Sequence, residues 1–408
     1  MEFTGVYHKT SEQMSYPLDE DRLIVNIKTG YDVKQVFIHY GDPYEAGILG
    51  GNEKWTGKRE EIIYKKRLPH QIWWTTTLFP AYKRCKYYFE LRTEKEVWYY
   101  FEDGFLTEEQ LQMEGRIQQC FIVPWMNPAD INRTPAWVND TIWYQIFPDR
   151  FNRECLNDSA RGTCIPAFSR AEYHEKLGRR IIRHKDWFEP VLYSPCAGEK
   201  FYSPCDYYGG DFAGIKQKLP YLAQIGVSVI YLNPIFEAAS NHRYNTSDYL
   251  SVDPILGSDY DLTELSKAAA EYGIRLMADG VFSHTGDDSV YFNKYGTYPS
   301  CGAYSGADSP YYKWYEFKHF PDEYRCWWGF KTLPEVNELQ PDYVRFTENV
   351  LKKWAGCGIT SWRLDVADEL PDEFIKKLRT ALKKLDSDGV LLGEVWEDAS
   401  NKVSGGGL

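Results

Sequence analysis

Two carboxylic acids at the ends of two apolar runs have the chemistry of a catalytic pair, and an arginine stands beside one of them. Arg363 and Asp365 stand two residues apart in ITSWRLDV (359–366), and Glu394 follows the apolar run VLLG (390–393). Residues two apart share one face of a strand. An adjacent arginine lowers the pKa of a carboxyl, whereas an apolar flank raises it. The pattern therefore predicts an ionised nucleophile, Asp365, and a protonated general acid, Glu394.

The spacing of neighbouring strands, about 4.8 Å, is compatible with the ~5–5.5 Å between the two carboxyl groups of a retaining glycosidase. Asp365 would attack an anomeric carbon, and Glu394 would protonate the leaving oxygen and then activate water. Two other interpretations stay open. Arg363 and Asp365 can form an ordinary structural ion pair, and Glu394 can be a capping or solvated carboxylate.

Alternating strands and helices are expected to position these residues. Apolar runs predict strands at 141–151, 227–236, 274–284, 359–366 and 390–395, and amphipathic segments predict helices at 211–226, 261–273, 341–358 and 371–386. Repeated βα units predict a parallel sheet, doubly wound or closed into a barrel, and both place active sites at the carboxyl ends of the strands. A long polar and aromatic loop, about 286–340, interrupts the alternation.

The first 125 residues have a different pattern, which predicts an all-β sandwich. Short aromatic and β-branched runs alternate with turn residues: RLIVNIKTG (22–30), KQVFIHYGD (34–42), QIWWTTTLF (71–79), CKYYFELRT (85–93) and EVWYYFE (96–102). Residues 126–135 contain Pro128 and Pro135 and are expected to form a linker. Residues 136–408 then form the barrel part of the chain.

Composition excludes several classes of function. The 408 residues carry 47 Lys and Arg against 59 Asp and Glu, a net charge of −12, which argues against nucleic-acid and anionic-membrane partners. No run of 18 apolar residues is present, and the start MEFTGVYHKT shows no signal peptide, so a cytoplasmic location is expected. The nine cysteines lack zinc spacing. No GxGxxG or phosphate-binding loop is present, so no organic cofactor is expected and a dehydrogenase is excluded.

Several motifs spread along the chain resemble glycoside hydrolase family 13, the α-amylase family. Three of them resemble conserved regions of the whole family: DGVFSH (279–284), GITSWRLDVADE (358–369) and LLGEVW (391–396). Others resemble the subgroup of cyclomaltodextrinases, neopullulanases and maltogenic amylases: YQIFPDRF (144–151), YYGGDFAGI (207–215), NHRYNTSDY (241–249) and WWGFKTLPEVN (327–337). The resemblance implies a TIM-type (β/α)8 barrel preceded by a β-sandwich similar to carbohydrate-binding module family 34.

Matched position by position, the resemblance implies a role for each site residue. Asp365 matches the nucleophile, Glu394 the acid/base and Arg363 the partner of the nucleophile. Matching substrate-binding residues are His284, Tyr244 and Asp279, and Trp396 is expected to reach the cleft. The implied activity is retaining hydrolysis of α-1,4 and, in this subgroup, sometimes α-1,6 glucosidic bonds in cyclodextrins, pullulan, maltooligosaccharides or starch.

The resemblance further implies a structural calcium site near the start of the barrel and, for the full-length form, a homodimer. The matching calcium ligands are Asn152, Glu154, Asn157, Asp158, Gly209 and Asp211, in which Glu154 stands where an Asp is common. An Asx-rich turn without metal is the alternative. Ser283 replaces the asparagine that binds calcium in conventional α-amylases, so that second site is not expected.

Only about five βα units can be counted, and no counterpart of the family's third catalytic carboxylate follows Glu394. We therefore expect a chain truncated at its C-terminus, with little or no activity by itself. A non-catalytic glucan-binding protein and a transglycosylase of the same family are the alternatives. Binding without turnover would identify the first, and product analysis would identify the second.

Overall fold

The computed structural model describes the chain except for residues 45–54, 56, 114–118, 129–130, 132, 154–169, 196–201, 400–401 and 404–406. Its contacts divide the chain into two units. One unit contains Met1–Arg133 together with Asp398–Gly407, and the other contains Thr134–Glu397 together with Leu408. Each unit has its own hydrophobic core.

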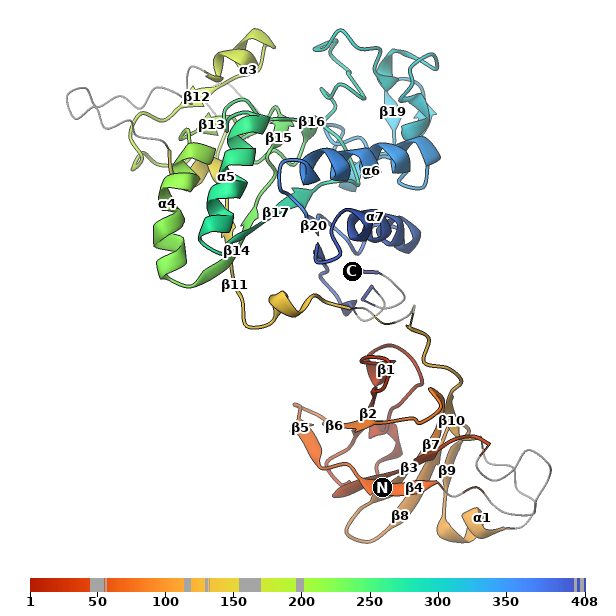
Figure 1. The fold of residues 1–408 in the computed structure, drawn as a ribbon. Coiled ribbons are helices and arrows are strands. Elements are labelled where there is room, and N and C mark those ends of the chain that lie inside the picture. Colours follow the sequence, from red (N-terminus) through yellow and green to blue (C-terminus); the bar gives the residue numbers. More distant parts are fainter. Residues whose placement is uncertain are drawn as a thin grey trace. The chain divides into compact units, whose positions relative to one another are not determined.

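The first unit is a sandwich of two antiparallel sheets (Figure 1). One sheet has the order β1 (Ser15–Pro17), β2 (Leu23–Thr29), β6 (Ile72–Leu78) and β5 (Tyr64–Arg67). The other has the order β4 (Lys58–Glu61), β3 (Gln35–Gly41), β7 (Cys85–Arg92), β8 (Val97–Phe101) and β9 (Gly104–Leu106), and β10 (Phe121–Val123) pairs with β7. The short helix α1 (Glu108–Gln112) follows β9 and is closed by a capping box.

Alternating apolar side chains fill the space between the two sheets. Leu23, Val25 and Ile27 lie on one face of β2 and are fully buried. Trp74 is also buried and donates from its indole N–H to Thr29 Oγ1 at 2.8 Å, which satisfies its polar atom inside the core. The period of two that predicted the sandwich therefore corresponds to an inward and an outward face, and the all-β prediction is confirmed.

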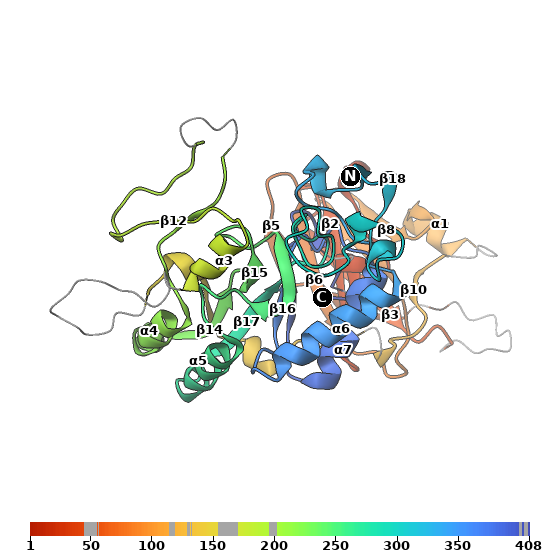
Figure 2. The same ribbon diagram turned by 90° about the horizontal axis from the view of Figure 1, so that it is seen from above.

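The second unit contains a curled, five-stranded parallel sheet with helices along its outer side (Figure 1, Figure 2). The strands are β11 (Ile142–Ile146), β14 (Val227–Leu232), β17 (Arg275–Gly280), β20 (Trp362–Leu364) and β21 (Leu391–Gly393), in that spatial order. The intervening helices are α4 (Phe212–Gln224), α5 (Asp259–Glu271), α6 (Pro341–Ala355) and α7 (Asp372–Leu385). Sequence order equals spatial order, as in one half of a barrel, so the predicted fold class is confirmed.

The strands are shorter than the sequence predicted, and β20 and β21 end just before Asp365 and Glu394. The predicted strand 359–366 is regular only over Trp362–Leu364. The helix predicted to begin at Asp261 begins two residues earlier, at Asp259. Ser258 is the N-cap and accepts from Asp261 N–H, and Asp261 completes a capping box.

Short elements in the connections form the rim of the sheet's carboxyl end. They are α3 (Glu172–Lys176), β12 (Ile182–Arg183), β13 (Asp206–Tyr207), β15 (Phe236–Ala238), β16 (Thr246–Val252), β18 (Phe317–His319) and β19 (Glu323–Tyr324). The predicted loop 286–340 contains β18 and β19 and buries several rings in the barrel core, including Phe292 and Trp314. None of the described helices has the length and apolar character needed to cross a lipid bilayer.

Aromatic packing joins the sheet to its helices. Phe236 is 1% exposed, and its ring lies 5.1 Å from that of Trp354 on α6 and 6.1 Å from that of Trp362 on β20. Three large rings from three separate segments thus pack together at β20, the strand that carries Arg363. We expect this contact to fix the distance between α6 and the sheet.

Replacing Phe236 by alanine is expected to lower the free energy of unfolding of the barrel unit by about 3–5 kcal/mol, because the cavity it leaves is lined by rings that cannot collapse. Urea unfolding followed by tryptophan fluorescence measures this change. Tyr260→Ala on α5, where the side chain is 69% exposed, is the matched control. A change below about 1 kcal/mol for Phe236→Ala would contradict the described packing.

Candidate active site

Arg363 stands at the centre of a cluster of three carboxylates at the carboxyl end of the parallel sheet. Strand register places it beside Asp279 of β17, and Leu364 pairs with Gly393 of β21. Asp365 and Glu394 each follow their strand by one residue, so they are brought to the same end. The structure brings Arg363, Asp365 and Glu394 together, as predicted, and it adds Asp279 to the cluster.

The guanidinium of Arg363 contacts all three acids. Its Nη1 donates to Asp279 Oδ1 at 2.8 Å and to Asp365 Oδ1 at 2.7 Å, and its Nη2 lies 2.6 Å from Glu394 Oε2. The side chain of Asp279 is fully buried, that of Asp365 is 10% exposed, and that of Glu394 is 29% exposed. Because adjacent nitrogens of one planar group hold Asp365 and Glu394, the two carboxyls face the same small volume.

Two tyrosines complete the environment of Asp279. Tyr231 on β14 and Tyr244 in the following loop donate their hydroxyls to Asp279 Oδ2 at 2.5 and 2.9 Å. Asn233 donates in turn to the Tyr244 hydroxyl at 3.2 Å. Asp279 is thus saturated by protein groups and serves to orient Arg363 and Tyr244, whereas the resemblance implied that it binds substrate.

The backbone after Asp365 takes a conformation that connects the two acids. Val366 has a φ of +43°, which is costly for a β-branched residue. In this conformation its N–H donates to Glu394 Oε2 at 3.1 Å, and Ala367 N–H donates to the Glu394 carbonyl at 2.9 Å. Local strain at Val366 therefore fixes Glu394 relative to Asp365.

The electrostatics reverse the protonation that the sequence predicted. Burial, together with the charges of Asp279 and Glu394, raises the pKa of Asp365 to about 7 against the opposing effect of Arg363. Burial also acts to raise the pKa of Glu394, but the Val366 N–H and the Arg363 charge outweigh it and lower that pKa. The expectation failed because one cation is shared among three acids, and because Glu394 receives direct hydrogen bonds that strand neighbours do not reveal.

His284 lies next to this cluster and is neutral. Its side chain is buried, with Nε2 at 3.2 Å from the Tyr244 carbonyl and Nδ1 at 2.9 Å from Ser283 Oγ. Burial lowers the pKa of His284 to about 4. Because a carbonyl only accepts, Nε2 carries the proton and Nδ1 accepts from the Ser283 hydroxyl.

An aromatic ledge, defined as Trp327, Trp328 and Trp396, borders the same end of the sheet. The rings of Trp327 and Trp328 stack at 5.0 Å, and Trp396 meets Trp328 edge-on at 5.9 Å with 66% of its surface exposed. Glu369 accepts from both indole N–H groups of the stacked pair at 2.9 Å each. Trp396 is exposed beside this pair, and its place in a substrate cleft stays a prediction. The sequence did not point to Glu369, because its motif gives no hint of a tryptophan partner.

A cavity of about 740 Å³ adjoins the ledge. Trp327 is shared, since its ring lies 5.5 Å from that of His284 and also lines the cavity. The other walls combine rings with polar groups: Tyr202, His242, Tyr295, Phe330, Arg179, Asp287 and Asp288. Its volume lies within the ~300–1,000 Å³ typical of small-molecule sites.

Arg179 holds the polar wall of this cavity together. The side chain is 6% exposed, and it contacts Asp288 at 2.7 Å and Glu237 at 3.1 Å. It also donates to the Tyr298 hydroxyl at 2.9 Å. Sequence analysis missed Arg179, because its acidic partners Glu237 and Asp288 lie more than 50 residues away and no local motif marks it.

The predicted calcium ligands do not form an oxygen cage as far as they are described. Asp211 is the N-cap of α4, with Oδ1 accepting from Gly214 N–H at 2.8 Å and Oδ2 paired with Arg170 at 2.9 Å. Asn152 donates to the Gly214 carbonyl, and Gly209 N–H donates to Asp149. Both carboxylate oxygens of Asp211 are therefore already engaged. Glu154, Asn157 and Asp158 lie outside the described residues.

Thermal unfolding in CaCl₂ and in EDTA tests whether calcium binds at Asp211. Binding at Asp211 would have to displace Arg170, so we expect the melting temperature to be the same in both buffers within about 1 °C. A rise of several degrees in CaCl₂ that Asp211→Asn abolishes would show that residues beyond the described part complete the site.

Comparisons with known proteins match both units. The family described as alpha amylase, catalytic domain, matches residues 145–404, and the alpha amylase N-terminal Ig-like domain matches residues 1–127. A cyclomaltodextrinase of Geobacillus thermopakistaniensis (strain MAS1) is 32% identical over 405 residues, and a maltogenic α-amylase of Bacillus acidopullulyticus is 30% identical over 405 residues. Each alignment covers 97% of this chain and 61% of the relative.

A solved structure gives the same result. A cyclomaltodextrinase superposes with a TM-score of 0.79 at 27% identity, over 100% of this chain and 63% of that one. The chain thus spans about three fifths of the length of the relatives it matches.

The raised pKa of Asp365 predicts how stability depends on pH. An unfolded aspartate has a pKa of about 3.9, so between pH 4 and 7 the folded state binds more protons and loses stability as pH rises. Asp365→Asn removes this titration. The melting temperature of the variant minus that of wild type is expected to be higher at pH 8 than at pH 4.5 by about 3 °C or more.

Differential scanning calorimetry at the two pH values measures the effect. Asp308→Asn, at an exposed position, is the control and should shift equally at both. An Asp365→Asn difference that is the same at both pH values would contradict the assigned pKa.

Proposed function

The chain belongs to the α-amylase family, and on that premise we propose that it hydrolyses the α-1,4-glucosidic bonds of α-glucans with retention of configuration. The observation that carries the proposal is the sharing of the Arg363 guanidinium between Asp365 and Glu394. Two carboxyls that face one small volume at the strand ends supply a nucleophile and an acid/base.

The contacts support a definite order in which the two acids carry the proton. Before substrate binds, the proton resides on Asp365, because Glu394 is held ionised by Arg363 and by Val366 N–H. A glycosidic oxygen that enters between the acids separates Glu394 from Arg363. Glu394 loses two stabilising contacts and takes up the proton, while Asp365 keeps the Nη1 contact and ionises.

The chemistry then follows in two displacements. Asp365 Oδ attacks the anomeric carbon while the glycosidic C–O bond breaks, and Glu394 gives its proton to the leaving oxygen. Water next gives a proton to Glu394 and attacks the same carbon, which breaks the bond to Asp365. The products are two saccharides with the α-configuration retained.

The neighbouring residues support an oligosaccharide substrate. Tyr244, held by Asp279, and His284 lie beside the acids and are proposed to contact the sugar that is attacked. The aromatic ledge and the 740 Å³ cavity extend from that point and offer flat rings with polar groups between them. Such surfaces suit sugars, whose rings have an apolar face and a polar rim.

The names of the relatives support a proposal for the substrate class. They are a cyclomaltodextrinase, a maltogenic α-amylase and several amylopullulanases. For this chain we therefore propose cyclodextrins, maltooligosaccharides and pullulan, with α-1,6 bonds as a second cleavage target. Transglycosylation by the same glycosyl-enzyme would give longer products in place of reducing ends, and chromatography of the products distinguishes the two.

Release of reducing sugar from β-cyclodextrin and pullulan tests the proposal. Glu394→Gln and Asp365→Asn are each expected to lower kcat at least a thousandfold, because each removes a group that bonds to the reacting atoms. Glu397→Gln, an exposed carboxylate three residues from Glu394, is the matched control and should retain full activity. Proton NMR of the first product should show the α-anomer. A β-anomer, or unchanged kcat in Glu394→Gln, would refute the mechanism.

We further predict that these 408 residues alone hydrolyse substrate slowly. The described sheet has five strands, and the alignment with the Geobacillus relative covers 61% of the length of that protein. The chain should therefore be compared with a version extended by the remaining part of the Geobacillus relative. The extended protein is expected to be at least a hundredfold faster. Equal turnover would refute this prediction, and glucan binding without turnover in both proteins would refute the hydrolase itself.

A further inference from the structure

Two adjacent aspartates on the wall of the 740 Å³ cavity differ in what they contact. Asp288 is fully engaged, because it faces Arg179 at 2.7 Å and accepts from the Ser247 hydroxyl at 2.9 Å. Asp287 is only 7% exposed, yet no cation pairs with it in the part of the chain that the structure describes. The only hydrogen bond that its carboxylate accepts from another described residue comes from the Tyr295 hydroxyl, at 2.7 Å. Asp287 therefore keeps acceptor capacity that the protein does not use.

The burial of this unpaired acid is unfavourable. Burial raises the pKa of Asp287 to about 6, against the opposing effect of the Tyr295 hydroxyl. Two nearby charges nearly offset each other, since Asp288 raises this pKa and Lys294 lowers it. Lys294 does not pair with the acid, because its Nζ donates to the Tyr324 hydroxyl at 3.2 Å. A neutral side chain would be cheaper to bury, so stability does not explain the carboxylate.

The group that donates to Asp287 also presents a flat ring to the cavity. The Tyr295 ring is 64% exposed although its hydroxyl is held, and its nearest cation, Lys294 Nζ, lies 5.8 Å from the ring centroid. A second exposed ring of the cavity, Phe330, stacks on Trp327 at 6.3 Å. Exposed rings beside a free acceptor suit the apolar face and the hydroxyl rim of a neutral sugar.

The cavity lies beside the catalytic acids but does not include them. Neither Asp365 nor Glu394 lines it. Trp327 does line it, and the ring of Trp327 lies 5.5 Å from that of His284, which is proposed to contact the attacked sugar. A saccharide unit beside Asp287 is thus near the cleavage point without being the unit attacked.

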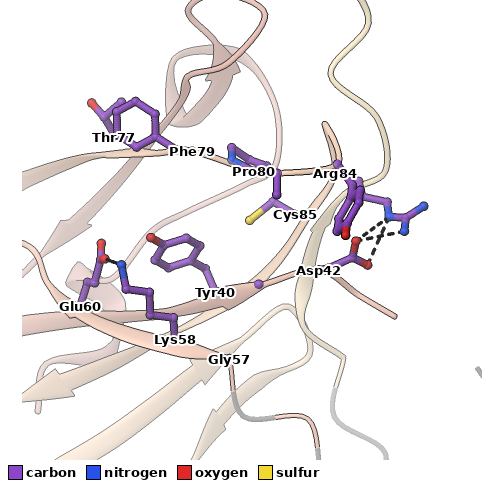
Figure 3. A pocket seen from close by; sticks show the side chains of 13 residues that line it. Tyr40, Asp42, Gly57, Lys58, Glu60, Thr77, Phe79, Pro80, Arg84 and Cys85 are labelled. Carbon is purple, nitrogen blue, oxygen red and sulfur yellow. Dashed lines mark hydrogen bonds and ion pairs between the residues drawn. The ribbon is translucent and has the colours of Figure 1, made fainter. Parts of the chain in front are cut away.

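The sandwich unit has a cavity of similar size, about 690 Å³, in which every charged side chain described is paired (Figure 3). Arg84 Nη2 lies 3.0 Å from Asp42 Oδ2, and Lys58 pairs with Glu60. Among the described residues that line these two cavities, Asp287 is the acid that has no cation. Pairing is therefore the ordinary arrangement in this protein, and its absence at Asp287 calls for a ligand that supplies neutral donors.

From this contrast we propose that Asp287 and Tyr295 bind a glucosyl unit beyond the one attacked, and that Asp287 determines a preference for longer, neutral glucans. The inference rests on the proposed function for its substrate class. Neighbouring hydroxyls of the sugar donate to the Asp287 carboxylate, and the Tyr295 ring contacts the C–H face. Arg179 positions this wall through Asp288. The unpaired negative charge disfavours phosphorylated and other anionic sugars.

Hydrolysis of maltoheptaose and of α-glucosyl fluoride, which occupies only the place of the attacked sugar, tests the proposal. Asp287→Ala is expected to lower the ratio of kcat/KM for maltoheptaose to kcat/KM for α-glucosyl fluoride at least tenfold. The loss should lie in KM and not in kcat, because the contact is made equally before and during the reaction. Asp308→Ala, at an exposed acid of the same loop that does not line the cavity, is the matched control. An unchanged ratio in Asp287→Ala overturns the proposal.

A second variant separates recognition from a structural role. Asp287→Asn keeps the shape of the side chain and an acceptor for Tyr295 but removes the buried charge. At pH 8, where the raised pKa of Asp287 leaves the carboxylate ionised in the folded protein, this variant is expected to melt about 2 °C or more above wild type. Its KM for maltoheptaose should nevertheless rise. A variant that melts below wild type and keeps the wild-type KM overturns the proposal.

Binding measured without turnover distinguishes failure of this proposal from failure of the proposed function. Isothermal titration calorimetry of maltoheptaose with the 408-residue chain carrying Glu394→Gln should give an affinity at least tenfold weaker when Asp287→Ala is added. That result supports the glucosyl site even where the unmodified chain hydrolyses nothing, and only the proposed function then fails. Equal affinity with and without Asp287→Ala overturns the site, whether or not hydrolysis occurs.

Discussion

The charge of Arg363 against three carboxylates is the interaction on which the site depends. Asp279, Asp365 and Glu394 end three successive strands, and without a shared cation their mutual repulsion at one end of the sheet would be uncompensated. Removing one partner from a buried ion pair typically costs about 3–5 kcal/mol, because the other charge is left unpaired. The positions of the three acids are therefore fixed by one guanidinium, and that guanidinium is itself fixed by Asp279.

The surrounding structure can be understood as support for this arrangement. Tyr231 and Tyr244 saturate Asp279, strain at Val366 directs an N–H to Glu394, and Phe236, Trp354 and Trp362 pack behind the strands. The arrangement stores unfavourable energy, since a buried Asp365 has a raised pKa and Val366 has a positive φ. Under the proposed function, a substrate that relieves one of these contacts shifts the proton to the other acid.

Much of the architecture could be predicted from sequence, because apolar runs and polar strand ends are local signals. The order of the five strands, the sandwich, and the meeting of Arg363, Asp365 and Glu394 follow from period and register. The protonation order could not, since it depends on Val366 N–H and on a shared cation. Glu369 and Arg179 were missed because their partners are distant in sequence. Asp211 was predicted as a calcium ligand by resemblance alone, and its described contacts cap α4 and pair it with Arg170.

Trapping of the glycosyl-enzyme tests the central claim most directly. The chain is incubated with a fluorinated α-glucosyl fluoride whose covalent adduct hydrolyses slowly, and the modified peptide is located by mass spectrometry. A single turnover is sufficient, so the measurement does not depend on a fast enzyme. The account predicts one sugar on Asp365, and none in Asp365→Asn or in a chain whose Arg363 is replaced by methionine. A sugar on Asp279 or Glu394, or an unchanged adduct in the Arg363→Met chain, would contradict it.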